Sequence, residues 1–211
     1  MPAAERREVI VRTATEVFSE RGYDGASIDE IARRAGVSAP VVYDHFASKQ
    51  ELYERLLERT RDELLEVWRE HLFTDEPAAV RIPRAIAAWA AYVETHRDAS
   101  RMYFRDPTGV PAVQRFHRAI HDQGRAALGA ILGREAGAAN IAGAADAESL
   151  EMAAEVMRAG LAGLAIWWSD HAHVPREQIV TTAVNVLWVG FERVRSSAGV
   201  GGDAGERQRP H

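Results

Sequence analysis

The sequence contains no cysteine, only one lysine, and no uninterrupted apolar run long enough to span a membrane. The lack of cysteine excludes disulfides, thiolate metal sites and cysteine nucleophiles, and it fits a reducing compartment. A transmembrane helix needs about 20 predominantly apolar residues. The opening residues MPAAERREVI also lack the apolar centre of a signal peptide. We therefore expect a cytoplasmic protein that does not contact the membrane.

Motifs typical of enzymes are missing as well. The chain has no Gly-rich phosphate loop, no nucleophile elbow and no recognisable Ser/His/Asp constellation. His117 and His121 stand four residues apart, a spacing that can bind a metal ion, but no HExxH context surrounds them. We expect no enzymatic activity, no cofactor and no metal ion, and we interpret the two histidines as ordinary core or surface residues.

The residues that are present favour an all-α fold. Hydrophobic residues make up 46% of the 211 positions, enough for a folded core. They recur at intervals of three and four residues, whereas the alternation typical of strands is rare. Residues 136–149 are predicted to form a loop, and residues 197–211 a disordered tail. The predicted helices cover about 3–21, 28–35, 38–45, 49–72, 78–95, 98–105, 111–133, 146–171 and 175–196.

Residues 28–47 have the pattern of a helix-turn-helix. Gly36 can adopt the positive φ that the turn requires. Ser27, followed three residues later by Glu30, forms a capping box for the first helix. Ser38 is placed to cap the second helix, whose outer face would meet the major groove of DNA.

The charges in this region do not show the expected basic surface. The net charge is −5, and residues 1–60 carry nine basic side chains against eleven acidic ones. A DNA-binding domain usually has a basic face. The outer face of the second helix offers Ala39, Pro40 and Val41 instead, so base recognition would rely on apolar contacts with thymine methyl groups.

The run SIDEIARRAGVSAPVVYDHFASKQELY, preceded by Gly22-Tyr23, resembles the TetR/AcrR-type bacterial transcription regulators. The resemblance covers about residues 5–65 and implies a DNA-binding domain there. It also implies a helical domain over residues 72–196 that dimerises and binds a small molecule. The protein would then be a homodimer on a palindromic DNA operator, most simply a repressor released by a small apolar or aromatic ligand.

The resemblance also implies which residues contact DNA. In the family, the lysine that matches Lys49 contacts a DNA phosphate. Helix N-termini attract anions, and a cation placed there opposes the dipole of its own helix. A phosphate beside Lys49 would resolve that conflict. The predicted contacts are Ser27, Ile28, Ser38, Ala39, Pro40, Val41, Tyr43, His45 and Lys49.

The second half of the chain offers two further sites. Small and apolar residues in the last two helices predict a four-helix dimer interface made by Met157, Gly160, Leu161, Leu164, Trp168, Val184, Leu187, Trp188 and Phe191. Aromatic and scattered polar residues predict a ligand pocket lined by Trp68, Trp89, Tyr92, Met102, Tyr103, Phe116, His117, Ile120, His121 and Trp168. Either set would also suit an ordinary helical core.

Two alternative functions fit the same sequence. One is a DNA-binding or architectural protein that responds to no ligand. The other is a helical adaptor for protein partners that no longer binds DNA, which the acidic balance of residues 1–60 would permit.

Overall fold

The computed structural model describes residues 2–105, 107, 109–138 and 147–189, and all regular structure in them is helical. None of the helices in these residues is long and apolar enough to cross a membrane. The all-α expectation is confirmed for this part of the chain. The helices are α1 Ala3–Gly25, α2 Ile28–Ala35, α3 Ala39–Tyr43, α4 Lys49–Leu72, α5 Ala78–Thr95, α6 Arg97–Phe104, α7 Pro111–Ala138, α8 Ala147–Asp170 and α9 Arg176–Ala183, followed by the π-helical turn η1 Val184–Trp188.

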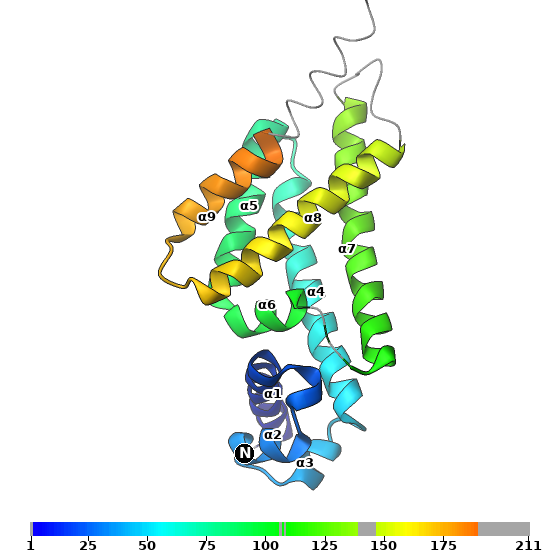
Figure 1. Ribbon diagram of the computed structural model, residues 1–211, viewed down its shortest axis with the longest axis vertical. Coiled ribbons are helices and arrows are strands. Elements are labelled where there is room, and N and C mark those ends of the chain that lie inside the picture. Colours follow the sequence, from blue (N-terminus) through cyan, green and yellow to red (C-terminus); the bar gives the residue numbers. More distant parts are fainter. Residues whose placement is uncertain (1, 106, 108, 139–146, 190–211) are drawn as a thin grey trace, which may run out of the picture.

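The helices form two groups along the long axis of the molecule (Figure 1). Helices α1, α2 and α3 lie together at one end, and α5, α7, α8 and α9 lie towards the other. Helix α4 begins beside the first group and continues into the second, where it packs against α5 and α7. Helix α6 lies between the groups and packs against α1 on one side and α8 on the other.

Buried aromatic residues hold α1 against α4. The Tyr53 ring meets Phe18 edge-on at a centroid distance of 5.0 Å and Tyr23 at 5.1 Å. Edge-to-face pairs of this kind add to the hydrophobic gain of burial. Because Phe18 and Tyr23 belong to α1 and Tyr53 to α4, the cluster fixes the first group of helices on the helix that leads into the second.

The helix boundaries follow the sequence signals closely at some ends and not at others. The side chain of Ser27 accepts a hydrogen bond from the Glu30 backbone N–H at 3.2 Å, as the capping box predicts. The Glu30 carboxylate does not return to the cap, because it binds Arg34 at 2.7 Å. Ser38 has the extended backbone of a cap, but its side chain accepts no capping hydrogen bond.

The ends of four helices differ from prediction. Helix α1, expected to end at residue 21, continues to Gly25 across a kink at Gly22, whose φ is 69°. Helix α3 stops at Tyr43, two residues before the expected end, and α7 continues to Ala138. The last predicted helix becomes α9 and η1 as far as Trp188. The remainder of that predicted helix, with Phe191, and the predicted tail 197–211 lie outside the described residues.

Candidate nucleic-acid interface and ligand pocket

The turn between α2 and α3 sets the direction of α3. Gly36 has φ 69° and ψ 30°, the left-handed conformation that side chains with a Cβ resist, and its N–H bonds back to α2. The Val37 N–H then donates to the Ala32 carbonyl at 3.0 Å. Beyond the turn, Val42 and Phe46 are buried in the core. Because these two residues fix one side of α3, its opposite side faces solvent.

Most of the predicted DNA contacts lie on that outer side. Ser27, Ser38, Pro40 and Tyr43 are exposed, with 53% of Tyr43 accessible. Ala39, Val41 and His45 are partly exposed. Ile28 is the exception among these positions.

The side chain of Ile28 is buried in the core between the first helices, so the predicted DNA contact at this position would be made by the backbone. Ile28 opens α2, and its apolar side chain completes the buried face of that short helix. At this position only the backbone N–H could meet a phosphate.

The side chain of Lys49 was expected to extend towards solvent, but it folds back onto the end of α1. Its ammonium group donates to the carbonyl oxygens of Tyr23 at 2.9 Å and Ala26 at 3.0 Å. It also lies 4.3 Å from the centroid of the Tyr23 ring. These contacts join the first residue of α4 to the end of α1.

The physical reason for the difference lies in the last turn of α1. Carbonyl oxygens at a helix C-terminus carry partial negative charge and lack partners within the helix, so cations are favourable there. The carbonyl oxygens of Tyr23 and Ala26 therefore take the place of the phosphate that was predicted as the negative partner of Lys49. Two of the three ammonium hydrogens of Lys49 are used in this way. A phosphate contact through the third stays a prediction.

The surface around α3 has an unusual charge distribution. Residues 37–48 contain no lysine or arginine. A cation reaches them from α1, where the Arg7 guanidinium lies 5.2 Å from the centroid of the Phe46 ring. Neighbouring acidic groups are tied to arginines, and the hydrogen bond from Arg34 lowers the pKa of Glu20. These ion pairs do not involve α3, and because they join charges of opposite sign within residues 1–60 they leave the acidic balance of that region unchanged.

A polar chain links the two groups of helices. The Tyr92 hydroxyl of α5 donates to Glu63 at 2.7 Å, and Arg59 donates to the same carboxylate at 2.9 Å. Arg59 also bonds Glu8 of α1 at 3.0 Å. Burial, followed by the hydrogen bond to Glu63, raises the pKa of Tyr92, which keeps the phenol neutral and donating.

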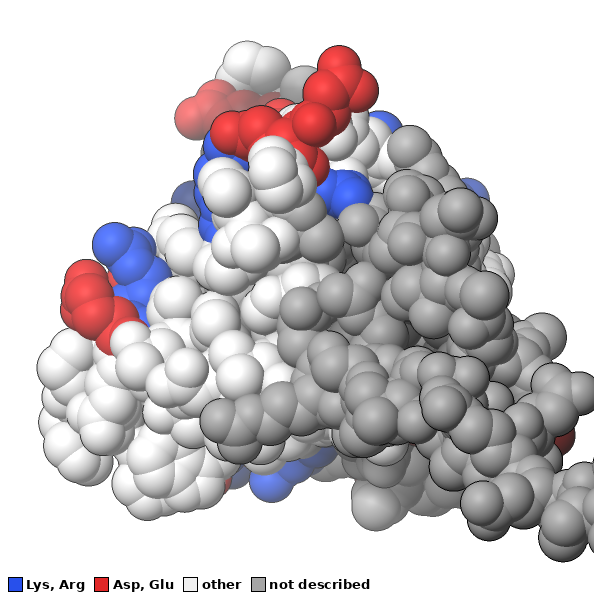
Figure 2. Space-filling view, turned by 90° about the horizontal axis from the view of Figure 1, so that it is seen from above, with Lys and Arg blue, Asp and Glu red and all other residues white. Residues whose placement is uncertain are grey.

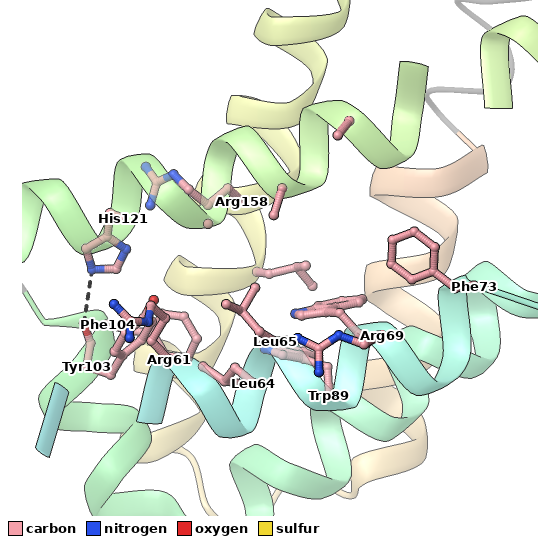
Figure 3. Close-up of a pocket in the computed structure, with 15 residues that line it drawn as sticks. Arg61, Leu64, Leu65, Arg69, Phe73, Trp89, Tyr103, Phe104, His121 and Arg158 are labelled. Carbon is pink, nitrogen blue, oxygen red and sulfur yellow. Dashed lines mark hydrogen bonds between the residues drawn. The ribbon is translucent and has the colours of Figure 1, made fainter. Parts of the chain in front are cut away.

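A cavity of about 360 Å³ lies between α4, α5, α6, α7 and α8 (Figure 3). Such a volume lies within the range of small-molecule sites. Most of its lining is apolar, and four of its residues come from the predicted pocket. These are Trp68, Trp89, Tyr103 and His121.

The other predicted pocket residues do not line this cavity. Met102 faces a second, more polar cavity of about 290 Å³ between α1, α4 and α6. Tyr92 belongs to the polar chain described above, and the buried Trp168 donates its indole N–H to the Val174 carbonyl at 2.9 Å. Phe116, His117 and Ile120 belong to α7 and do not line the cavity.

The two histidines of α7 lie close together, with ring centroids 4.6 Å apart. His121 donates from Nε2 to the Tyr103 carbonyl at 3.1 Å, since a carbonyl oxygen can only accept. Among the described residues, no group of three or more metal-type ligands is assembled.

The sequence prediction missed the basic residues of the larger cavity. Arg61, Arg69 and Arg158 line it, together with Leu64, Leu65, Phe73 and Phe104. Arg61, Leu65 and Trp68 recur at helical spacing along α4, so a search for one face of that helix would have found them. The arginines do not match the apolar and aromatic pattern from which a ligand pocket is predicted.

Four residues of the predicted dimer interface, Met157, Leu161, Trp168 and Trp188, are buried within the protomer, where they form part of its core. Leu164, Val184 and Leu187 are partly exposed. Gly160 serves internal packing, because a Cβ there would lie 2.8 Å from a methyl group of Leu187.

The outer face of α8 carries a different set of apolar residues. Val156 and Trp167 are 65% and 45% exposed, and Gly163 lies between them on the same face. Val186 of η1 is also exposed. The Trp167 ring stacks on His171 at 4.0 Å, which holds the indole in place at the surface. We call Met152, Val156, Gly163 and Trp167 the α8 face.

The fold and the exposed α3 define the class of the protein, an all-helical DNA-binding regulator with a helix-turn-helix. Residues 10–56 match the family model described as bacterial regulatory proteins, tetR family. The transcriptional activator FasR of Mycolicibacterium smegmatis is 30% identical over 201 residues, covering 92% of this chain and 86% of that protein. The chain belongs to the TetR family and is therefore a transcription regulator rather than an enzyme.

Solved structures show the same fold. A TetR-like transcriptional regulator from Rhodococcus sp. RHA1 matches with a TM-score of 0.73 and 19% identity, covering 91% of this chain and 98% of that chain. FadR of Bacillus subtilis in complex with stearoyl-CoA matches with a TM-score of 0.69 and 17% identity, covering 87% and 96%.

Proposed function

We propose that the protein is a homodimeric regulator that binds a palindromic operator and is released from it by a small ligand. Residues 5–65 would bind DNA, and residues 72–196 would dimerise and bind the ligand in the cytoplasm. The observation that carries the proposal is the exposed outer side of α3, held by the Gly36 turn and by the buried Val42 and Phe46. A helix presented in this way can enter the major groove.

The proposed base contacts are apolar. Ala39, Pro40 and Val41 occupy the start of α3, where they would meet thymine methyl groups. Ser27, Ser38, Tyr43 and His45 would contact phosphates, with the third ammonium hydrogen of Lys49 as a further donor. Arg7 brings positive charge to the same side from α1.

Dimerisation is proposed through the α8 face. One recognition helix covers too little sequence to define a site, and two helices spaced about one turn of DNA apart are the usual solution. Val156 and Trp167 are large apolar residues left exposed in the protomer, and a second copy would cover them. The small Gly163 permits close approach at the centre of that face.

The cavity of about 360 Å³ is the proposed ligand site. Its tryptophans and leucines suit an apolar or aromatic molecule, and the stearoyl-CoA complex of Bacillus subtilis FadR supports an apolar chain in a protein of this fold. The ligand would favour a conformation in which the recognition helices no longer match the spacing of the half-sites. Helix α4 enters both groups of helices and would transmit the change.

Repression follows if the operator overlaps a promoter, because the bound dimer excludes polymerase. Activation is the second candidate, since the similar protein of Mycolicibacterium smegmatis is named an activator. In vitro transcription from the selected operator distinguishes them. Repression predicts fewer transcripts with protein present, and activation predicts more.

The proposal is tested by selecting duplexes from a random pool with the purified full-length protein. We expect a palindromic site, with Tyr43→Ala weakening binding to every duplex and Val80→Ala, an exposed change on α5, leaving binding unaltered. Replacing the thymines beneath α3 by uracil removes one methyl group each, and we expect roughly a fourfold loss per contacted methyl. No enrichment of any duplex would favour the protein adaptor. A ligand-independent protein would bind its operator equally with and without metabolite extracts.

A further inference from the structure

The larger cavity is not uniformly apolar. Arg61, His121 and Arg158 line it together with Tyr103, and in Figure 3 Arg61, Tyr103 and His121 lie at one end while Phe73 lies towards the other. A third arginine, Arg69, lies on the side of Phe73, but its side chain is 61% exposed and is paired with Glu66. Burial raises the pKa of the Tyr103 phenol to about 12. The positive charges of Arg61 and Arg158 lie close enough to this phenol to lower its pKa in part. This basic end is built from α4, α6, α7 and α8.

None of the residues that line the cavity is acidic. The carboxylates that pair with its arginines lie outside it, where Asp62 holds Arg61 at 2.8 Å and Glu155 holds Arg158 at 2.9 Å. Both carboxylates are well exposed and screened by water, whereas the Arg61 side chain is only 20% exposed. The arginines therefore leave a positive potential inside the cavity although each has a partner.

We propose that the ligand is an anionic amphiphile, an apolar chain that ends in a carboxylate or phosphate group, with the anion held by Arg61, Arg158 and His121. The inference rests on the proposed ligand function of this cavity and names the chemistry of its ligand. Guanidinium groups bind such anions through charge-assisted hydrogen bonds. The chain extends from the basic end past Leu65 and Trp89 towards Phe73.

The proposed anion site is connected to the DNA-binding helices through α6. Tyr103 belongs to α6, which packs against α1. Arg61 bonds Gln123 of α7 at 3.0 Å, so a ligand that recruits Arg61 competes with that link between α4 and α7. A neutral ligand of the same length would fill the apolar part of the cavity without this competition.

The test compares ligands of one chain length and different head charge on the full-length protein. Dodecanoate, dodecanol and dodecyltrimethylammonium are titrated below their micelle concentrations, with tryptophan fluorescence and calorimetry as readouts. We expect dodecanoate to bind at least roughly tenfold more tightly than the other two. Dodecanoyl-CoA is titrated in parallel and distinguishes a free acid from a thioester as the source of the anion. Equal binding of the three head groups, or no binding of any, overturns the proposal.

Charge variants locate the anion. Arg61→Gln and Arg158→Gln should each weaken dodecanoate roughly tenfold and leave dodecanol unchanged, which also shows that the cavity remains folded. Arg125→Gln is the matched control, because Arg125 lies on α7 near Glu151 but does not line the cavity. Loss of dodecanoate binding in the control variant as well would contradict the assigned site.

Operator binding is measured separately by fluorescence anisotropy of labelled duplex. If dodecanoate binds through the arginines and operator affinity stays constant, the anion site stands and the proposed ligand release is wrong. If operator binding is intact and no amphiphile binds, the anion site is wrong and the DNA-binding function stands.

Discussion

Lys49 illustrates how one side chain can join two helices. The ammonium group bonds two carbonyls at the end of α1 and lies against the Tyr23 ring, while its own residue begins α4. The junction thus depends on a cation that satisfies the C-terminal end of one helix from the N-terminal end of another. An arginine would bring a larger, planar group to a space that an ammonium fills.

We expect Lys49→Met to lower the free energy of unfolding by about 2 kcal/mol, because the charged hydrogen bonds to the two carbonyls are lost while the aliphatic stem is kept. Chemical denaturation followed by circular dichroism measures the change. Arg33→Met, on an exposed residue of α2, is the control. Unchanged stability of Lys49→Met would mean that the carbonyl contacts contribute nothing, and a shallower salt dependence of operator binding would then point to the phosphate contact.

Tyr53 gives a prediction for alkaline pH. Burial raises the pKa of its phenol from 10.0 to about 12. The neutral phenol stabilises the folded state fully below pH 10, and this contribution is lost as pH rises to about 12, since the unfolded chain ionises first. Urea midpoints between these pH values should therefore fall less steeply in Tyr53→Phe than in the parent. Tyr43→Phe, which removes an exposed hydroxyl, should keep the parental slope.

At the scale of the element, the α2–α3 turn depends on Gly36. Its φ of 69° is left-handed, and a Cβ added there would meet nothing within 4 Å, so only backbone strain opposes a side chain. We expect Gly36→Ala to lower the free energy of unfolding by about 1 kcal/mol and Gly36→Asn to cost less.

The same substitution has the opposite expected sign within a helix. Gly124 of α7 also has open space around its Cβ position and a helical backbone. Gly124→Ala should therefore raise the free energy of unfolding by up to about 1 kcal/mol. Denaturation curves of the two alanine variants test both signs, and a loss of equal size in each would contradict the role assigned to the turn.

The helix-turn-helix could be predicted because its signals are local. A capping serine, a glycine at the turn and apolar residues at fixed spacing determine α2 and α3 within about twenty residues. The contacts of Lys49 could not be predicted in this way, because its partners Tyr23 and Ala26 are distant in sequence. The periodicity of α8 identified its apolar residues, but not which of them face the protomer core, since that depends on how α8 packs against α6 and α7.

At the scale of the whole molecule, the described part of the surface includes a region with few charged side chains at the end remote from α1–α3 (Figure 2). In the view from the end remote from α1–α3, few charged side chains interrupt the lower left of the surface, on the side where α9 lies in Figure 1 (Figure 2). A face poor in charge can be buried without desolvating unpaired ions, which favours association.

A charge placed on the α8 face should separate the subunits. We expect Val156→Arg to raise the dimer dissociation constant at least roughly tenfold, because association would bury a guanidinium with no partner. Val80→Arg is the matched control, since Val80 is 48% exposed on α5 and lies outside the α8 face. Light scattering over a dilution series measures both variants.

Val156→Arg also tests whether operator binding depends on dimerisation. If two recognition helices must read linked half-sites, a Val156→Arg monomer should lose most of its affinity for the full operator while keeping its weak affinity for a single half-site, because the DNA-binding helices themselves are unchanged. Fluorescence anisotropy on full-operator and half-site duplexes measures the two affinities. If the variant dissociates into monomers and still binds the full operator as tightly as the parent, the protein does not bind its operator as a dimer. If the variant stays dimeric, the α8 face is not the dimer interface.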